Sequence, residues 1–169
     1  VGENMYTILK KEVLNPTVTR MVIDAPFVAK RAKAGQFIIL RVNEEGERIP
    51  LTIADSDSEK GTVSIIFQIV GKTTMLLNTL EEGDSLHDFV GPLGKPSEID
   101  GNEKVCIIGG GVGCAIAYPT AKAFHEAGSD VTTIVGFRNK DLVILEDEFK
   151  ECSDAYYLMS DDGSVGQKG

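Results

Sequence analysis

The chain has 169 residues, of which 42% are hydrophobic and 25% charged, and its formal net charge is −9. This composition is typical of a globular protein with one or two small domains. The negative charge argues against nucleic-acid binding, because phosphates would be repelled. No apolar run approaches the roughly 20 residues of a membrane helix, and the N-terminus has no signal-peptide core. We therefore expect a cytoplasmic protein that binds neither nucleic acid nor membrane.

The first hundred residues are predicted to form a six-stranded antiparallel barrel, because short β-branched and apolar runs alternate with turn residues. The strands are expected at residues 5–14, 18–24, 37–42, 48–54, 62–70 and 85–90. One helix is expected here, capped by Thr73 or Thr74 and with an apolar face around Leu77. Residues 91–96 are predicted to be a linker, since their two glycines and two prolines suit neither a helix nor a central strand.

Beyond residue 96 the pattern changes to alternating strands and helices. Strands are expected at 104–108, 131–135 and 155–159, with helices near 118–127 and 142–149. Pro119 suits the first turn of the earlier helix, and Gly128 suits its end. This order predicts a parallel α/β sheet. The chain thus divides into domains at 1–96 and 97–169, and we expect the second to be incomplete at its C-terminus, because three parallel strands are few for a nucleotide-binding domain.

A glycine-rich turn follows the first strand of the α/β domain, with the sequence Gly109-Gly110-Gly111-Val112-Gly113. Backbone N–H groups and the dipole of the following helix favour a phosphate there. The turn lacks the third glycine of the G-x-G-x-x-G fingerprint, and Gly136-Phe137-Arg138 stands where that fold carries an acidic residue. We therefore expect a nicotinamide dinucleotide on a different type of α/β fold. The alternative is a turn that only packs a strand against a helix.

Three other segments carry groups suited to a nucleotide. Arg48-Ile49-Pro50-Leu51-Thr52 places a guanidinium, which can bind a pyrophosphate, on the same strand face as a hydroxyl. Ile69-Val70-Gly71-Lys72-Thr73-Thr74 ends a strand and begins a helix, whose N-terminus can bind a phosphate. Asp161-Asp162-Gly163-Ser164 follows the last strand and can accept ribose hydroxyls. The alternatives are a hairpin turn, a helix cap and a polar turn.

The three cysteines, Cys106, Cys114 and Cys152, lack CxxC spacing, which argues against a metal site within these residues. Cys106 lies in an apolar strand and is expected in the core. Cys114 follows the glycine turn, and a thiol at a helix N-terminus can have a lowered pKa. Cys114 is therefore a candidate supporting residue beside a nicotinamide, although we expect no side-chain nucleophile or general base.

Together, and in this order, these motifs resemble the ferredoxin–NADP reductase superfamily over nearly the whole chain. The glycine turn, Gly136-Phe137-Arg138 and the segment from Asp161 to Gly169 are similar to one branch. That branch contains the dihydroorotate dehydrogenase electron-transfer subunit, the sulfhydrogenase gamma subunit and the alpha subunit of NADH-dependent reduced ferredoxin:NADP oxidoreductase; residues 48–55 and 91–94 are most similar to the last. The resemblance implies a flavin-binding barrel at 1–96 and an NAD(P)-binding α/β domain at 97–169.

The resemblance also implies an electron-transfer flavoprotein subunit that passes hydride from NAD(P)H to FAD and electrons onward to iron–sulfur centres of a partner oxidoreductase. Arg48 and the helix at Thr74 would hold the flavin pyrophosphate, and Thr52 would tune the flavin. FAD is favoured over FMN through the resemblance alone. A [2Fe–2S] cluster is implied only for a further C-terminal segment, with no metal in these residues.

NAD(H) is preferred to NADP(H), because Asp161 and Asp162 would repel a 2′-phosphate. Arg138 and Lys140 follow the second strand and favour the opposite choice. The alternative function is a dinucleotide-sensing or assembly module without turnover, which would hold no flavin.

Overall fold

The computed structural model describes residues 6–101 and 103–169, so the expected start of the first strand at residue 5 lies outside the described residues. The chain divides into two units, Val1–Pro96 and Ser97–Gly169. Within the described ranges, no helix combines the length and the apolar character of a membrane span.

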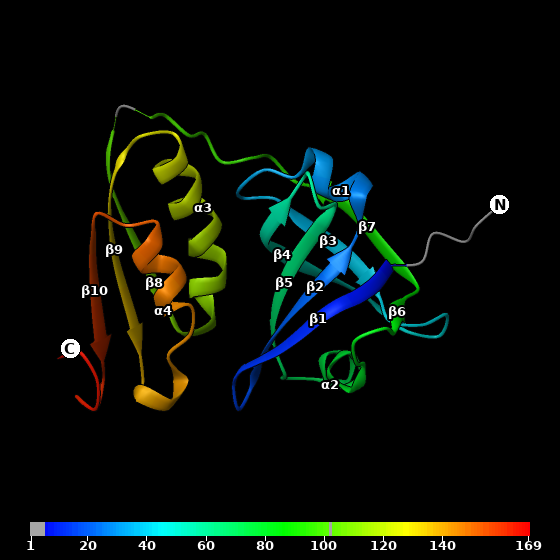
Figure 1. Cartoon of the computed structure of the whole chain (residues 1–169). Helices are drawn as coiled ribbons and strands as arrows, with labels where there is room; N and C mark the ends of the chain where they lie inside the picture. The colour runs from blue at the N-terminus through cyan, green and yellow to red at the C-terminus, as the bar shows by residue number, and fades with distance from the viewer. Residues whose placement is uncertain (1–5, 102) are drawn as a thin grey trace. The chain divides into compact units, whose positions relative to one another are not determined.

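The first unit is built on a seven-stranded antiparallel sheet, with strand order β6-β1-β2-β5-β4-β3-β7. The edge strands β6 and β7 follow each other directly in the chain, so the sheet curls into a nearly closed barrel (Figure 1). The strands are β1 (Tyr6–Asn15), β2 (Val18–Asp24), β3 (Phe37–Arg41), β4 (Arg48–Asp57), β5 (Thr62–Gln68), β6 (Ser85–Leu86) and β7 (Asp88–Leu93).

The antiparallel barrel expected from the sequence is confirmed, but it has seven strands rather than six. The single strand expected at 85–90 is divided, because β6 pairs with β1 whereas β7 pairs with β3. Since β7 continues to Leu93, the predicted linker is wrong over its first three residues. Pro92 is tolerated there because β7 is an edge strand, where a missing N–H costs no ladder hydrogen bond.

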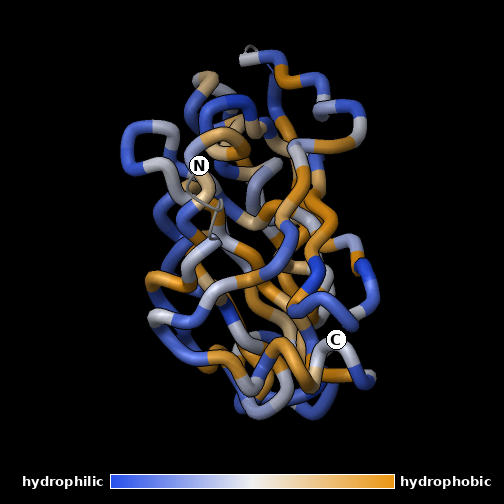
Figure 2. Tube along the Cα trace, turned by 90° about the vertical axis from the view of Figure 1, so that its right-hand side faces the viewer, coloured by the Kyte–Doolittle hydropathy of each residue, from blue (hydrophilic) through white to orange (hydrophobic). Residues whose placement is uncertain are grey.

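Two helices belong to the first unit, α1 (Pro26–Arg31) and α2 (Lys72–Thr79). Only α2 was expected. Ala25-Pro26 was interpreted as a turn, whereas Pro26 begins a short helix, a position that suits its fixed φ. Figure 2 shows that hydrophobic stretches alternate with hydrophilic ones along the chain. The barrel core contains Met21, Ile38, Phe67, Phe89 and, from α2, Leu77.

The second unit is a four-stranded parallel sheet with order β11-β10-β9-β8. Its strands are β8 (Lys104–Gly110), β9 (Asp130–Phe137), β10 (Ala155–Ser160) and β11 (Gln167–Lys168). Two α-helices, α3 (Cys114–Glu126) and α4 (Glu146–Glu151), lie on the same face of this sheet (Figure 1). Single 3₁₀ turns are η1 (Gly111–Gly113) and η2 (Lys140–Leu142). The parallel sheet is confirmed, with β11 in addition to the three expected strands.

Helix α3 begins at Cys114, four residues before the expected start. Pro119 therefore lies inside the helix, and its expected place in the first turn is wrong. The reason is that η1 leads straight from β8 into α3 without an intervening loop. The helix ends after Glu126, and Gly128 follows with φ +93°, as expected for a residue that terminates a helix.

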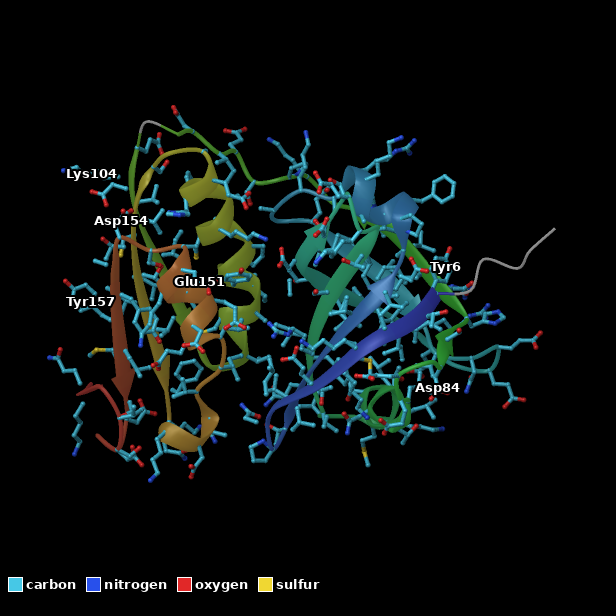
Figure 3. All side chains as sticks on the ribbon, in the orientation of Figure 1. Tyr6, Asp84, Lys104, Glu151, Asp154 and Tyr157 are labelled. Carbon is cyan, nitrogen blue, oxygen red and sulfur yellow. The ribbon has the colours of Figure 1, made fainter. Side chains whose placement is uncertain are left out.

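The sheet face opposite the helices carries exposed apolar side chains. Tyr157 is 54% exposed and points away from α4 (Figure 3), and Ile108 is 73% exposed. Cys106 shares this face and is exposed, so its expected place in the core is wrong. An apolar strand has two faces, and its sequence alone did not tell which one the helices cover.

Candidate functional site

Strand β4 places the side chains of its first residues alternately inside and outside the barrel. Ile49 and Leu51 pack against the core, whereas Arg48 and Pro50 are exposed and Thr52 is half-buried. Arg48, Pro50 and Thr52 therefore share the outer face, where a guanidinium and a hydroxyl can reach the same ligand. The side chain of Leu51 supports this strand from the core side.

The Arg48 guanidinium remains largely available to a ligand. Its Nη2 lies 3.6 Å from Oδ2 of Asp88, and the side chain is 63% exposed. The same carboxylate oxygen accepts a hydrogen bond of 2.7 Å from Nε of Arg41, whose side chain is only 17% exposed. Because Arg41 is closer and more buried, it compensates most of the Asp88 charge. Arg48 thus keeps donors for an external anion.

The N-terminus of α2 is an open anion-binding position. Oγ1 of Thr74 accepts hydrogen bonds of 3.0 Å from the backbone N–H groups of Val70 and Gly71, and it donates to the Gly71 carbonyl. This capping leaves the N–H groups of Lys72, Thr73 and Thr74, which have no acceptor within the helix. A Cβ at Gly71 would meet no atom within 4 Å. Because the hydroxyl of Thr74 is occupied by the cap, Thr74 can bind a phosphate only through its backbone N–H.

One contact connects these two features. Oγ1 of Thr73 lies 3.4 Å from Oε2 of Glu47, the residue before Arg48. The start of β4 and the start of α2 are thereby neighbours in the first unit. Beside them Val70 is 73% exposed, whereas Ile69 packs partly against the core. A cation, an open helix N-terminus and an apolar surface are brought together in one place.

In the second unit, the segments expected to bind a dinucleotide lie at one edge of the sheet. Gly110 pairs with Gly136, and Gly136 pairs with Met159. The turns after β8, β9 and β10 therefore meet at the carboxyl ends of the strands, which is where open parallel sheets bind ligands. Arg138 is exposed, whereas the Phe137 side chain is buried.

The glycine turn combines a packing residue with open backbone. A Cβ at Gly109 would lie 3.0 Å from Sγ of Cys114, so Gly109 permits close contact between β8 and α3. A Cβ added at Gly110, Gly111 or Gly113 would meet no atom within 4 Å. Gly111 also has a positive φ of +54°. Strand–helix packing thus accounts for the first glycine alone. Around Val112, the rest of the turn offers bare backbone to a phosphate.

Cys114 does not have the lowered pKa expected at a helix N-terminus. Its side chain is fully buried, and this burial raises the pKa of the thiol to about 12. The expectation failed because Gly109 lets the thiol pack against β8, where desolvation of the thiolate outweighs the helix dipole. Cys114 therefore supports the glycine turn by packing.

Backbone and side-chain hydrogen bonds fasten the turn after β10 to the turn after β9. The N–H groups of Asp161 and Asp162 donate to the carbonyls of Phe137 and Arg138, and the N–H of Lys140 donates to Oγ of Ser164 at 2.8 Å. Hydrogen bonds from the side chain and the backbone of Ser164 lower the pKa of Asp162.

The turn after β10 carries a negative charge and is tight. The Asp162 carboxylate is ionised at neutral pH, since the ordinary pKa of an aspartate is about 3.9 and its own pKa is lower. Gly163 has φ +73° and provides the turn's left-handed residue. The two turns therefore present acidic and basic groups at the same sheet edge.

Sequence reasoning missed the two carboxylates beside the anion-binding groups of the first unit, Glu47 and Asp88. Glu47 is adjacent to Arg48 in the sequence, which is a usable signal, but its contact with Thr73 depends on tertiary structure. Asp88 reaches Arg48 only because Arg41 pairs with both residues in the sheet.

The donor set of the first unit fits the pyrophosphate of FAD. A guanidinium forms charge-assisted hydrogen bonds to phosphate oxygens, and the open N-terminus of α2 adds backbone donors. Thr52 offers a hydroxyl on the same face of β4.

Comparisons with known proteins identify the family of the first unit. Residues 6–97 match the family model of the oxidoreductase FAD-binding domain. The chain is 49% identical over 168 residues to a homolog of the electron transfer subunit of dihydroorotate dehydrogenase B (NAD(+)) from Thermotoga maritima, covering 99% of this chain and 59% of the relative. It is 35% identical over 172 residues to the electron transfer subunit of dihydroorotate dehydrogenase B (NAD(+)) from Streptococcus pneumoniae, covering 99% and 66%.

A solved structure of NADH-dependent reduced ferredoxin-NADP oxidoreductase has a TM-score of 0.91 and 48% identity to this chain. The match covers 99% of this chain and 60% of that chain. The chain thus spans about three fifths of the length of its Thermotoga maritima relative and of this solved chain.

Proposed function

Because this chain belongs to the family of oxidoreductases with an FAD-binding domain, we propose that it is the electron-transfer subunit of an NAD(P)H-dependent flavoprotein. The first unit would hold FAD, the second would hold NAD(H), and a catalytic partner subunit with iron–sulfur centres would take the electrons. The observation that carries the proposal is the position of Arg48 next to the open N-terminus of α2, within the part that matches the family. The [2Fe–2S] cluster implied by the resemblance is assigned to the part of the relatives that this chain does not span.

When bound, FAD supplies the exchange between two-electron hydride chemistry and single-electron transfer. The protein binds and orients it. Arg48 would bind the pyrophosphate through its guanidinium, and the N–H groups of Lys72, Thr73 and Thr74 would donate to phosphate oxygens. Thr52 would offer its hydroxyl to the flavin ring system.

Other residues give this cofactor site its shape. Pro50 has a fixed φ, which stiffens the strand between Arg48 and Thr52. Val70, exposed in the connection between β5 and α2, offers an apolar contact, and Ile69 and Gly71 hold the backbone that leads into α2.

The second unit binds NAD(H) through open backbone and one acidic turn. Gly110, Gly111 and Gly113 leave room for a phosphate beside the start of α3. The ionised carboxylate of Asp162, together with Asp161, accepts ribose hydroxyls and repels a 2′-phosphate. This combination favours NADH over NADPH. Arg138, exposed at the same sheet edge, is the group that would favour NADPH.

The proposal is tested by loading the chain with FAD, removing free flavin and comparing anaerobic reduction by NADH and by NADPH. We expect NADH to reduce the flavin at least about tenfold more efficiently, a difference of ~1.4 kcal/mol in the barrier. The Asp161→Asn, Asp162→Asn double variant should narrow this preference, and Arg138→Ala should widen it. Equal efficiencies would contradict the choice of NAD(H), and failure to retain FAD would contradict the proposal as a whole.

A further inference from the structure

Helix α2 makes few apolar contacts with the barrel, although its N-terminus is part of the proposed flavin site. All eight residues of α2 are described, and Leu77 alone among them is buried. The preceding side chains of Met75 and Leu76 are 60% and 37% exposed. One buried side chain locates a helix but leaves it free to tilt. A fixed direction for the N–H groups at its N-terminus therefore needs a second attachment.

Polar side chains of two barrel strands provide this attachment at Asn78, in the last turn of α2. Oγ1 of Thr19, on β2, donates a hydrogen bond of 2.8 Å to Oδ1 of Asn78. Nζ of Lys11, on β1, donates a hydrogen bond of 2.7 Å to the backbone carbonyl of Asn78. The barrel thus holds α2 through both the side chain and the backbone of one residue.

Both donors lie where water competes weakly for them. Thr19 is 1% exposed, and the side chain of Lys11 is 13% exposed. A buried hydroxyl needs a hydrogen-bond partner, which Asn78 supplies. The Lys11 ammonium also lies at the negative end of the α2 dipole. Its ion pair with Glu81 adds little, because the Glu81 side chain is 72% exposed.

We propose that Thr19, Lys11 and Asn78 are positioning residues, which fix α2 so that the N–H groups of its first turn point at the phosphates of a bound flavin nucleotide. This inference rests on the flavin-binding function proposed above. Thr74 lies four residues before Asn78, about 6 Å along the helix axis, so a tilt at the last turn redirects the N–H groups of the first. Hydrogen bonds weaken steeply as they depart from linearity. Loss of the attachment should therefore weaken phosphate binding.

The experiment compares Thr19→Val with Thr19→Ser. Valine keeps the shape of threonine without the hydroxyl, whereas serine keeps the hydroxyl without the methyl group, so both variants change the same buried position. We expect FAD affinity, measured by fluorescence titration, to fall about tenfold in Thr19→Val, which corresponds to the loss of one charge-assisted hydrogen bond. In Thr19→Ser it should stay within about twofold of the unaltered chain. Equal affinities in the two variants would overturn the role of Thr19.

Lys11→Met tests the attachment from the other strand and does not depend on how Thr19→Val folds. Its control is Lys10→Met, which makes the same charge change at the neighbouring residue of β1, where the ammonium pairs with Glu12. FAD affinity should fall several-fold further in Lys11→Met than in Lys10→Met. Equal losses would show an effect of general charge and overturn the role of Lys11.

Hydrogen exchange in the flavin-free chain tests the attachment without the cofactor. Inside α2, the N–H of Met75 donates to the carbonyl of Gly71 at 2.9 Å. In Thr19→Val this N–H should exchange faster, as measured by NMR, while the N–H groups between β2 and β5 keep their rates. Unchanged exchange in α2 would overturn the positioning role and leave the flavin-binding function intact. If the unaltered chain binds no FAD, the proposed function itself fails.

Discussion

Replacement of Arg48 with alanine should release FAD while leaving the stability of the barrel nearly unchanged. The guanidinium is 63% exposed, and its ion pair with Asp88 spans 3.6 Å. An exposed pair of this kind contributes about 0–1 kcal/mol. Asp88 keeps its 2.7 Å hydrogen bond to Arg41 in the variant, so no buried charge loses its partner. We therefore expect the free energy of unfolding to fall by less than about 1 kcal/mol.

The loss of FAD affinity should be much larger. Hydrogen bonds to charged groups contribute about 1.5–3 kcal/mol, which corresponds to a rise of about 10- to 150-fold in the dissociation constant. FAD titration followed by fluorescence gives the affinity, and thermal unfolding of the same samples gives the stability. Arg31→Ala is the matched control, since it removes an exposed guanidinium from α1 with the same change of charge.

An affinity within about twofold of the unaltered chain, in an Arg48→Ala variant that unfolds normally, would refute the assignment of Arg48 to the pyrophosphate. It would mean that groups other than the Arg48 guanidinium hold the phosphates of FAD. A similar loss of affinity in Arg31→Ala would show that general charge, rather than a specific contact, attracts the nucleotide.

The remaining predictions concern the thiols and the pH dependence of stability. Brief treatment of the folded chain with iodoacetamide should alkylate exposed Cys106 and spare Cys114, because burial raises the pKa of the Cys114 thiol to about 12. Peptide mass spectrometry measures the alkylation of both thiols. Equal labelling would contradict the burial of Cys114. The hydrogen bond from Lys10, and less strongly that from Arg20, lowers the pKa of Glu12 against the opposing effect of partial burial. Because the folded pKa is the lower one, Glu12 stabilises the fold above its unfolded pKa of about 4.3 and loses this contribution as pH falls through the folded value. Between pH 7 and pH 3, the free energy of unfolding measured with denaturant should therefore change less in Glu12→Gln than in the unaltered chain. An equal change in both proteins would contradict the ion pairing.

Local sequence rules were sufficient where the structure is governed by local geometry. Period-two alternation correctly placed Arg48 and Thr52 on one face of β4. Gly128 was correctly expected to follow the end of α3, because glycine adopts a positive φ without strain. The same rules failed where two local signals compete. Pro26 suits both a turn and the first residue of a helix, and only the packing of Val28 and Ala29 into the barrel decides for α1.

Long-range contacts were beyond the reach of the sequence. The neighbourhood of Glu47 and Thr73 depends on the way the barrel brings α2 to the start of β4. Cys114 is buried because Gly109, on a different element, leaves room for its thiol. The helix dipole was recognised from the sequence, but the desolvation that opposes it depends on tertiary packing.

The most direct test of the account is the visible absorption spectrum of the FAD-loaded chain before and after anaerobic addition of NADH. We predict the absorption bands of bound, oxidised flavin, which should bleach when NADH is added. A chain that retains no flavin, or a bound flavin whose bands are unchanged by NADH, would contradict the assignment of this protein to electron transfer between a nicotinamide and FAD.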